Sequence, residues 1–275
     1  MELSGGVNCM TFHPDRETAH SEPGNTAKEF SYYPMGFGKF SLNGDINDVM
    51  GFNINIERDN VLQNSLKVIF SAKTDHFMIE FGPFAGVCDD FNIPDAGIVG
   101  AMQASLPGII SLTLSGFITL GTKLEYTSDN SREGLGASLR FWFPKMILTA
   151  SVNTKSLSRS SEDDMGTLIK TDALTKYMAT INFYTKGSPV MVTLEGGYQT
   201  YSRTYSRGKM DIEDKINSYF GGFELEIKAS EGLKIKAGVE IPFFITAEEP
   251  MTVTPEFLNL SKFIAGFIYT FNGRP

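Results

Sequence analysis

Apolar and polar residues alternate along most of this chain, which is the two-residue period of a β-strand. The clearest segment is 110–126, and it continues for about twice the usual strand length in globular proteins. We therefore expect long strands with one apolar and one polar face. In this segment the apolar face holds Ile110, Leu112, Leu114, Ile118, Leu120, Leu124 and Tyr126, and the polar face holds Ser111, Thr113, Ser115, Thr119, Lys123 and Glu125.

The same alternation recurs in at least eight further segments, whereas helical spacing hardly appears. The segments are 52–57, 66–73, 135–143, 148–153, 176–183, 190–199, 223–228 and 233–240. A membrane-spanning helix needs about 20 consecutive apolar residues, and the longest runs, at 96–102 and 241–245, are far shorter. The pattern excludes a helical membrane protein.

Short turns and longer polar connections alternate between these segments. The short turns are Gly44–Asp48, Lys73–Asp75, Pro107–Gly108, Pro144–Lys145, Lys186–Pro189 and Ser230–Gly232. The long connections are His13–Tyr32, Arg58–Asn64, Cys88–Asp95, Thr127–Arg132, Leu157–Lys170, Arg203–Asp214 and Thr246–Leu258. These boundaries predict about fourteen strands between Leu3 and Phe271. An even number places both termini at the end of the short turns.

Two architectures can use such strands. In a soluble sandwich or lipocalin-like barrel the apolar faces point inward, but a barrel of about fourteen strands is too wide for side chains to fill. Strands of about ten residues are long enough to cross a bilayer, and outer-membrane barrels alternate short with long connections. Aromatic residues at strand ends are typical of interfacial girdles: Tyr126, Phe143, Phe183, Tyr198, Phe243 and Phe271. The pattern favours a membrane barrel over the soluble sandwich.

Charge and targeting features narrow the function classes. The 275 residues carry a net charge of −8, with no basic arm and no block of five like charges, which argues against nucleic-acid binding. The two cysteines, Cys9 and Cys88, form neither a disulfide framework nor a metal motif. The N-terminus has no basic segment followed by an apolar stretch. Either the protein is cytosolic or its signal peptide has been removed, and the strand-like segment that begins at Leu3 favours a mature domain.

If the apolar faces meet lipid, the charged residues of the opposite faces line the lumen. Glu57 belongs to this set, together with Lys67, Glu80, Lys123, Glu125, Arg140, Lys155, Lys176, Glu195, Glu224, Glu226, Lys234, Lys236 and Glu240. Neither sign dominates. Such residues either shape the constriction of a hydrated pore or form ion pairs that satisfy a filled interior. The sequence leaves both interpretations open.

Catalytic and metal-binding patterns are weak. The three histidines, His13, His20 and His76, fall in a predicted loop or turn, and no serine has a Gly-x-Ser-x-Gly context. Asp89, Asp90, Asn92 and Asp95 could offer oxygen ligands to calcium, but they lack the spacing of a calcium motif. We expect no enzymatic activity, no metal and no cofactor.

The segment 263–271, FIAGFIYTF, resembles the C-terminal strand of bacterial outer-membrane barrels, with hydrophobic or aromatic residues at alternate positions and a final Phe. Ile264 replaces a usual polar residue, and four residues follow Phe271. The resemblance implies that Gly266, Tyr269 and Phe271 form a signal for the barrel-assembly machinery. Strand number and loop alternation are similar to those of small monomeric porins of about fourteen strands.

We therefore predict one domain over 1–275, an all-β transmembrane antiparallel up-and-down β-barrel of about 14 strands (12 to 14) with long external loops. Its predicted location is the bacterial outer membrane, and its predicted function is porin-like diffusion of small hydrophilic solutes or ions. The alternatives are an uptake channel for hydrophobic compounds and a closed barrel acting as a surface scaffold or adhesin. Expected partners are the lipid bilayer, the solutes and the assembly machinery, without nucleic acid.

Overall fold

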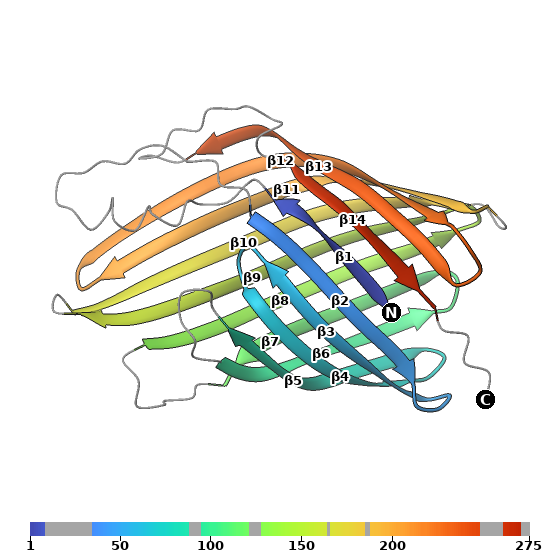
Figure 1. Cartoon of the computed structure of the whole chain (residues 1–275), viewed down its shortest axis with the longest axis horizontal. Helices are drawn as coiled ribbons and strands as arrows, with labels where there is room; N and C mark the ends of the chain where they lie inside the picture. Colours follow the sequence, from blue (N-terminus) through green and yellow to red (C-terminus); the bar gives the residue numbers. More distant parts are fainter. Residues whose placement is uncertain are drawn as a thin grey trace.

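The computed structural model describes residues 1–8, 35–87, 95–120, 128–163, 166–184, 188–247 and 261–270 (Figure 1). Regular structure in these ranges consists of fourteen β-strands. They are β1 (Glu2–Asn8), β2 (Met35–Asp45), β3 (Met50–Asp59), β4 (Gln63–Lys73), β5 (Phe77–Val87), β6 (Asp95–Leu106), β7 (Ile110–Thr119), β8 (Ser128–Phe143), β9 (Met146–Asp163), β10 (Gly166–Phe183), β11 (Val190–Arg207), β12 (Met210–Lys228), β13 (Leu233–Ala247) and β14 (Lys262–Tyr269). No helix in the described residues is long and apolar enough to cross a membrane.

Each strand pairs antiparallel with its neighbours in sequence, and β1 pairs with β14 to close the barrel. At the closure, the Tyr269 N–H donates to the Met1 carbonyl at 2.7 Å, and the Met1 amino group donates to the Tyr269 carbonyl at 2.8 Å. Figure 1 shows the blue β1 beside the red β14. The predicted all-β antiparallel barrel is confirmed, and its closure pairs the two terminal strands with each other, so that neither β1 nor β14 is left as an edge strand.

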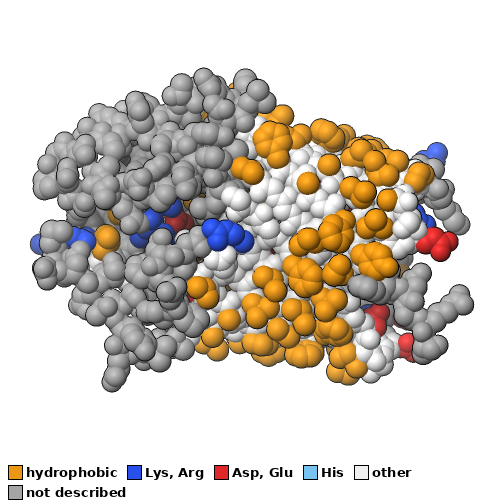
Figure 2. Space-filling view, in the orientation of Figure 1, with side chains coloured by type: hydrophobic (Ala, Val, Ile, Leu, Met, Phe, Trp, Pro, Cys, Tyr) orange, Lys and Arg blue, Asp and Glu red, His pale blue; other side chains and the backbone are white. Residues whose placement is uncertain are grey.

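The outer face of the barrel is apolar over the central part of the strands. Side chains at alternate positions, such as Leu114 on β7 and Leu194 on β11, are 46% and 45% exposed. Figure 2 shows this apolar surface over the part of the barrel it displays. A belt of this kind has to face lipid, because exposing so much apolar surface to water would be highly unfavourable in free energy.

An aromatic row marks one border of the belt. Tyr177, Tyr198, Tyr219 and Phe243 are successive cross-strand partners on β10, β11, β12 and β13. The rings of Tyr198 and Tyr219 are 5.3 Å apart, and the Tyr198 hydroxyl donates to Asn217 Oδ1 at 3.0 Å. Amphipathic rings of this kind are typical of the membrane–water interface.

Beyond the aromatic row, β8 to β12 extend well past the other strands. The predicted long connections at 157–170 and 203–214 are wrong, because most of these residues are strand: Asp163 of β9 pairs with Gly166 of β10, and Gly208, with a φ of +63°, lies in the tight turn between β11 and β12. The segment 127–132 is likewise strand from Ser128 onward. These segments are polar because they extend beyond the lipid bilayer. There the outer face of β11 carries Thr200, Ser202, Thr204 and Ser206.

The short turns all lie at the opposite end of the barrel from these extensions, as predicted. The predicted strand 110–126 ends as β7 at Thr119, and its remaining residues from 121 onward lie outside the described ranges. The segments 13–32, 88–94 and 248–258, and therefore Asp89, Asp90 and Asn92 of the acidic loop, also lie outside them. Asp95 is the first residue of β6.

Candidate functional site

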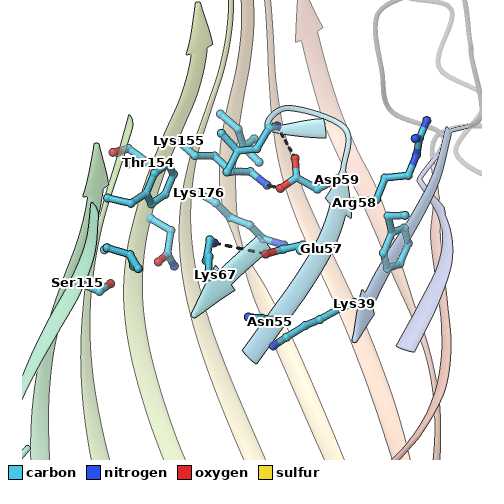
Figure 3. Close-up of a pocket in the computed structure, with 18 of the residues that line it drawn as sticks. Lys39, Asn55, Glu57, Arg58, Asp59, Lys67, Ser115, Thr154, Lys155 and Lys176 are labelled. Atoms are coloured by element: carbon cyan, nitrogen blue, oxygen red, sulfur yellow. Dashed lines mark hydrogen bonds and ion pairs between the residues drawn. The ribbon is translucent and has the colours of Figure 1, made fainter. Parts of the chain in front are cut away.

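Alternate residues of the strands face the inside of the barrel, where they surround a cavity of about 600 Å³. Lysines and carboxylates approach it from several strands, as the close-up of one part of it shows (Figure 3). Arg58 also borders the cavity, but its side chain points away from the others in this view. The described lysines are Lys39, Lys67, Lys155, Lys176, Lys236 and Lys262, and the described carboxylates are Glu57, Asp59, Glu80, Glu224 and Glu240.

Several of these charges form ion pairs. The Lys176 ammonium lies 2.6 Å from the Glu240 carboxylate, which joins β10 to β13, and Lys67 lies 3.6 Å from Glu57 on the adjacent strand. Lys236 on β13 pairs with a carboxylate of β1, that of Glu2. Opposite charges at these distances reduce the cost of placing ions inside a protein wall, while the cavity leaves room for water beside them.

The connection between β3 and β4 folds into the barrel. Asp59 Oδ1 accepts the backbone N–H groups of Val61 and Leu62, both at 2.7 Å, which closes a tight Asx turn. Gln63 completes the turn with a φ of +57°. The side chains of Val61 and Leu62 are 0% and 3% exposed. This turn, residues 59–63, is called the inward turn below.

The apolar tip of the inward turn packs against the opposite wall. Val61 and Leu62 form one buried cluster with Leu157 of β9, Tyr201 of β11 and Ile216 of β12. Phe117, Leu174 and Ile245 pack around this cluster. The cluster joins the connection between β3 and β4 to strands across the barrel, so it extends across the lumen at the level of the turn.

Arg132 holds the inward turn from β8. Its Nε donates to the Leu62 carbonyl at 2.9 Å, its guanidinium pairs with Asp95, and its side chain is fully buried. A Cβ added at Gly86 would lie 2.1 Å from the guanidinium, so the glycine supplies the space that Arg132 occupies. Lys155 of β9 adds a second anchor, with its ammonium 2.8 Å from Asp59 Oδ2.

A second buried ionic cluster lies near the inward turn. Asp172 of β10 accepts a hydrogen bond from Arg203 Nε at 2.5 Å and one from Arg159 at 3.2 Å. All three side chains are less than 10% exposed. Charge-assisted bonds among buried groups depend on every member, because a lost partner leaves an uncompensated charge. The outer part of the barrel is therefore cross-linked by ion pairs.

The structure places most of the predicted lumen residues inside the barrel. Eight line the cavity: Glu57, Lys67, Glu80, Lys155, Lys176, Glu224, Lys236 and Glu240. Glu195 lies over Gly222, whose added Cβ would meet the Glu195 carboxylate at 2.8 Å. Lys234 and Glu226 pair at 2.7 Å, and Arg140 lies 5.8 Å from the Trp142 ring centre. Lys123 and Glu125 lie outside the described residues.

Sequence reasoning missed the residues that fill the lumen. It assigned Asp59, Val61 and Leu62 to an external connection and Arg203 to another. An apolar pair inside a short polar connection, directly after an Asp, is the signal that could have identified an inward turn. Of the predicted assembly signal, Gly266 and Tyr269 lie on β14, and Phe271 is outside the described residues.

Comparison with known proteins gives structural similarity alone. No family model matches the chain, and no curated protein matches it. Among solved structures, the chain is similar to OmpT, an outer membrane protein of Vibrio cholerae, with 9% identity, coverage of 98% of this chain and 95% of that chain, and a TM-score of 0.45. It is also similar to a porin, with 8% identity, coverage of 98% and 99%, and a TM-score of 0.40. The transmembrane β-barrel is supported by this chain's own strand pairing and apolar belt, which are typical of bacterial outer-membrane barrels.

Proposed function

We propose that this barrel is a diffusion channel for small hydrophilic solutes or ions in the bacterial outer membrane. The observation that carries the proposal is the cavity of about 600 Å³ inside the barrel, with its six lysines and five carboxylates. Charged groups inside a membrane protein are stable where water or counter-charges satisfy them. A hydrated interior of this kind suits polar solutes and disfavours the alternative of hydrophobic uptake.

The inward turn is the constriction of the proposed channel. It places the Asp59–Lys155 pair and the apolar residues Val61 and Leu62 across the lumen, so a solute has to pass beside them. Opposed charges at a narrow point give selectivity through the field across the path. The size of the permeating solutes is then set by the position of this turn.

Conductance of the refolded protein in a planar lipid bilayer tests the proposal. We expect discrete current steps in potassium chloride that increase with salt concentration. Heat-modifiable migration in a detergent gel, run on the same preparation, shows that the barrel is folded. If folded barrels insert but carry no current at any salt concentration or voltage, the channel function is wrong.

A closed barrel that serves as a surface scaffold is the second candidate. The buried cluster of Val61, Leu62, Leu157, Tyr201 and Ile216 favours it, because an apolar cluster across the lumen also blocks water. In that case the long strands β8 to β12 would present a partner-binding surface outside the membrane. Absence of current in folded, inserted protein is the result that favours the scaffold.

A non-catalytic role and recognition by the outer-membrane assembly machinery complete the proposal. His76 is the one histidine in the described residues, and its Nδ1 lies 3.1 Å from the Ser105 carbonyl at a short turn. This contact supports a structural role at the turn.

For assembly, the paired β14 carries Gly266 and Tyr269 at the barrel closure, where insertion has to end.

A further inference from the structure

Two lysines on neighbouring parts of the cavity wall form no ion pair with a carboxylate of the described residues. Lys39 lies on β2 and Lys262 on β14, and both side chains line the cavity. The strand between β2 and β14 is β1, so the two lysines belong to the barrel closure. They differ in this respect from Lys67, Lys155, Lys176 and Lys236, each of which forms an ion pair.

The cross-strand neighbours of these two lysines form ion pairs with other residues. Lys39 is the direct cross-strand neighbour of Glu57, and Lys262 is the direct neighbour of Glu240. Glu57 pairs with Lys67 instead, and Glu240 pairs with Lys176 instead. The ammonium groups of Lys39 and Lys262 are therefore not held in close ion pairs, although Glu2, Glu195 and Glu240 lie within electrostatic range of them.

An aromatic ring lies between the two lysines. Phe37 is two residues before Lys39 on the same inner face of β2, and the Lys262 ammonium lies 4.8 Å from the centre of its ring. Gly6 of β1 makes this contact possible, because an added Cβ there would lie 3.0 Å from the ring. The ring thus extends over β1 toward β14.

We propose that Lys39, Lys262 and Phe37 form a binding subsite for a small organic anion, such as a carboxylate attached to a planar or apolar body. The two ammonium groups bind the carboxylate through charge-assisted hydrogen bonds, and the Phe37 ring contacts the body of the solute. The cavity volume is within the range of small-molecule sites. The inference rests on the proposed channel function and names the class of solute that the channel prefers.

Glu224 limits how tightly the proposed subsite binds an anion. Its carboxylate lines the same cavity and lies within electrostatic range of Lys236 and Lys262, although it forms no ion pair with a described lysine or arginine. A bound anion is therefore repelled by Glu224 while it is attracted by Lys39 and Lys262. Weak binding of this kind suits a channel, because a solute has to leave the site as well as enter it.

Equilibrium binding tests the subsite without any measurement of current. The refolded barrel in detergent micelles is titrated with 4-fluorobenzoate, and with the cation 4-fluorobenzylamine for comparison, by ¹⁹F NMR at low salt against empty micelles. We expect specific binding of the anion only. The double variant Lys39→Met/Lys262→Met should bind it about tenfold more weakly, because two charge-assisted bonds are lost, and Glu224→Gln should bind it more tightly.

Matched variants control for folding and for total charge. Lys73→Met removes one lysine that pairs with Asp45 at the short-turn end, so it should leave binding unchanged. Lys39→Arg/Lys262→Arg keeps both charges and should retain binding, which shows that the closure tolerates substitution. Equal binding of the cation, no binding of the anion, or full binding by the Met double variant would overturn the subsite. Current in the bilayer together with any of these results would leave the channel function standing.

Discussion

The carboxylate of Asp59 meets the ammonium of Lys155 at 2.8 Å inside the barrel, although five strands lie between β3 and β9 along the sheet. The same carboxylate organises the inward turn through the N–H groups of Val61 and Leu62. One side chain therefore sets both the shape of the turn and its attachment to the far wall. The proposed constriction therefore depends on Asp59.

Asp59→Ala should widen the proposed channel. The substitution removes two backbone hydrogen bonds and the ion pair to Lys155, so the turn loses the contacts that hold it across the lumen. We expect a higher single-channel conductance and frequent switching between levels. Planar-bilayer recording at fixed salt and voltage measures both.

Lys73→Met is the matched control for this variant. Lys73 and Asp45 also form an ion pair at 2.8 Å, but it is exposed at the short-turn end, where such pairs contribute little. Its conductance should equal that of the unaltered protein. If Asp59→Ala also leaves conductance unchanged, the inward turn is not the constriction.

Arg132→Met should destabilise the folded barrel by about 3 to 5 kcal/mol, the usual cost of removing one partner of a buried pair. The variant leaves the Asp95 carboxylate and the Leu62 carbonyl without the guanidinium. Urea unfolding in detergent, followed by tryptophan fluorescence, measures the loss. Arg132→Met combined with Asp95→Leu should recover part of it, because the uncompensated charge is then gone; no recovery would mean that the cost lies in packing.

Neighbouring residues of β7 test the orientation of the wall. Leu114 faces outward and Thr113 faces inward, where its hydroxyl hydrogen-bonds Gln103 at 3.4 Å. Leu114→Arg should cost about 2 to 4 kcal/mol near the bilayer midplane, whereas Thr113→Arg should cost much less because it meets the hydrated interior. Refolding into lipid vesicles at increasing urea concentration compares the two. An equal loss would argue against a lipid-facing Leu114.

The alternation of apolar and polar residues was sufficient to predict the number of strands and their short turns. The turn at Pro107–Gly108 is an example: Gly108 has a φ of +73°, β6 ends just before the turn and β7 begins just after it. Both signals are local, since period and turn chemistry depend on a few adjacent residues. The fold class therefore followed from short-range information.

The contents of the lumen could not be predicted in the same way. Lys176 and Glu240 are 64 residues apart, and their contact depends on the register of all the strands between them. The extension of β9 to β12 was also missed, because hydroxyl residues outside the bilayer resemble a loop in composition. Polarity indicates contact with water, but it does not distinguish a loop from a strand that leaves the membrane.

The C-terminal strand should be essential for insertion. β14 pairs with β1 from Glu2↔Ile268 to Asn8↔Lys262, so its removal leaves two unpaired edges in the bilayer. A chain that ends before Phe263 should fail to reach the outer membrane in cells, as followed by membrane fractionation and heat-modifiable migration. A chain that lacks only residues 272–275 is the control and should insert. Normal insertion of the shorter chain would disprove the assembly signal.

Ion selectivity of the proposed channel should be weak and should depend on Lys39 and Lys262. The described residues of the cavity include six lysines and five carboxylates, and most of them pair, so their fields largely cancel. We expect a small reversal potential across a potassium chloride gradient. It should decrease further at high mean salt, where the Debye length falls from about 8 Å to about 3 Å.

The double variant Lys39→Met/Lys262→Met should shift this reversal potential toward cation selectivity, because it removes two positive charges from the cavity wall that are not held in close ion pairs. The shift should be largest at low salt, since screening weakens the field of the remaining carboxylates as salt rises. Lys73→Met/Lys234→Met removes two lysines that form ion pairs with Asp45 and Glu226, so it is the charge-matched control and should shift the potential less. A reversal potential that is identical in the double variant and in the unaltered protein would show that permeating ions do not pass this wall.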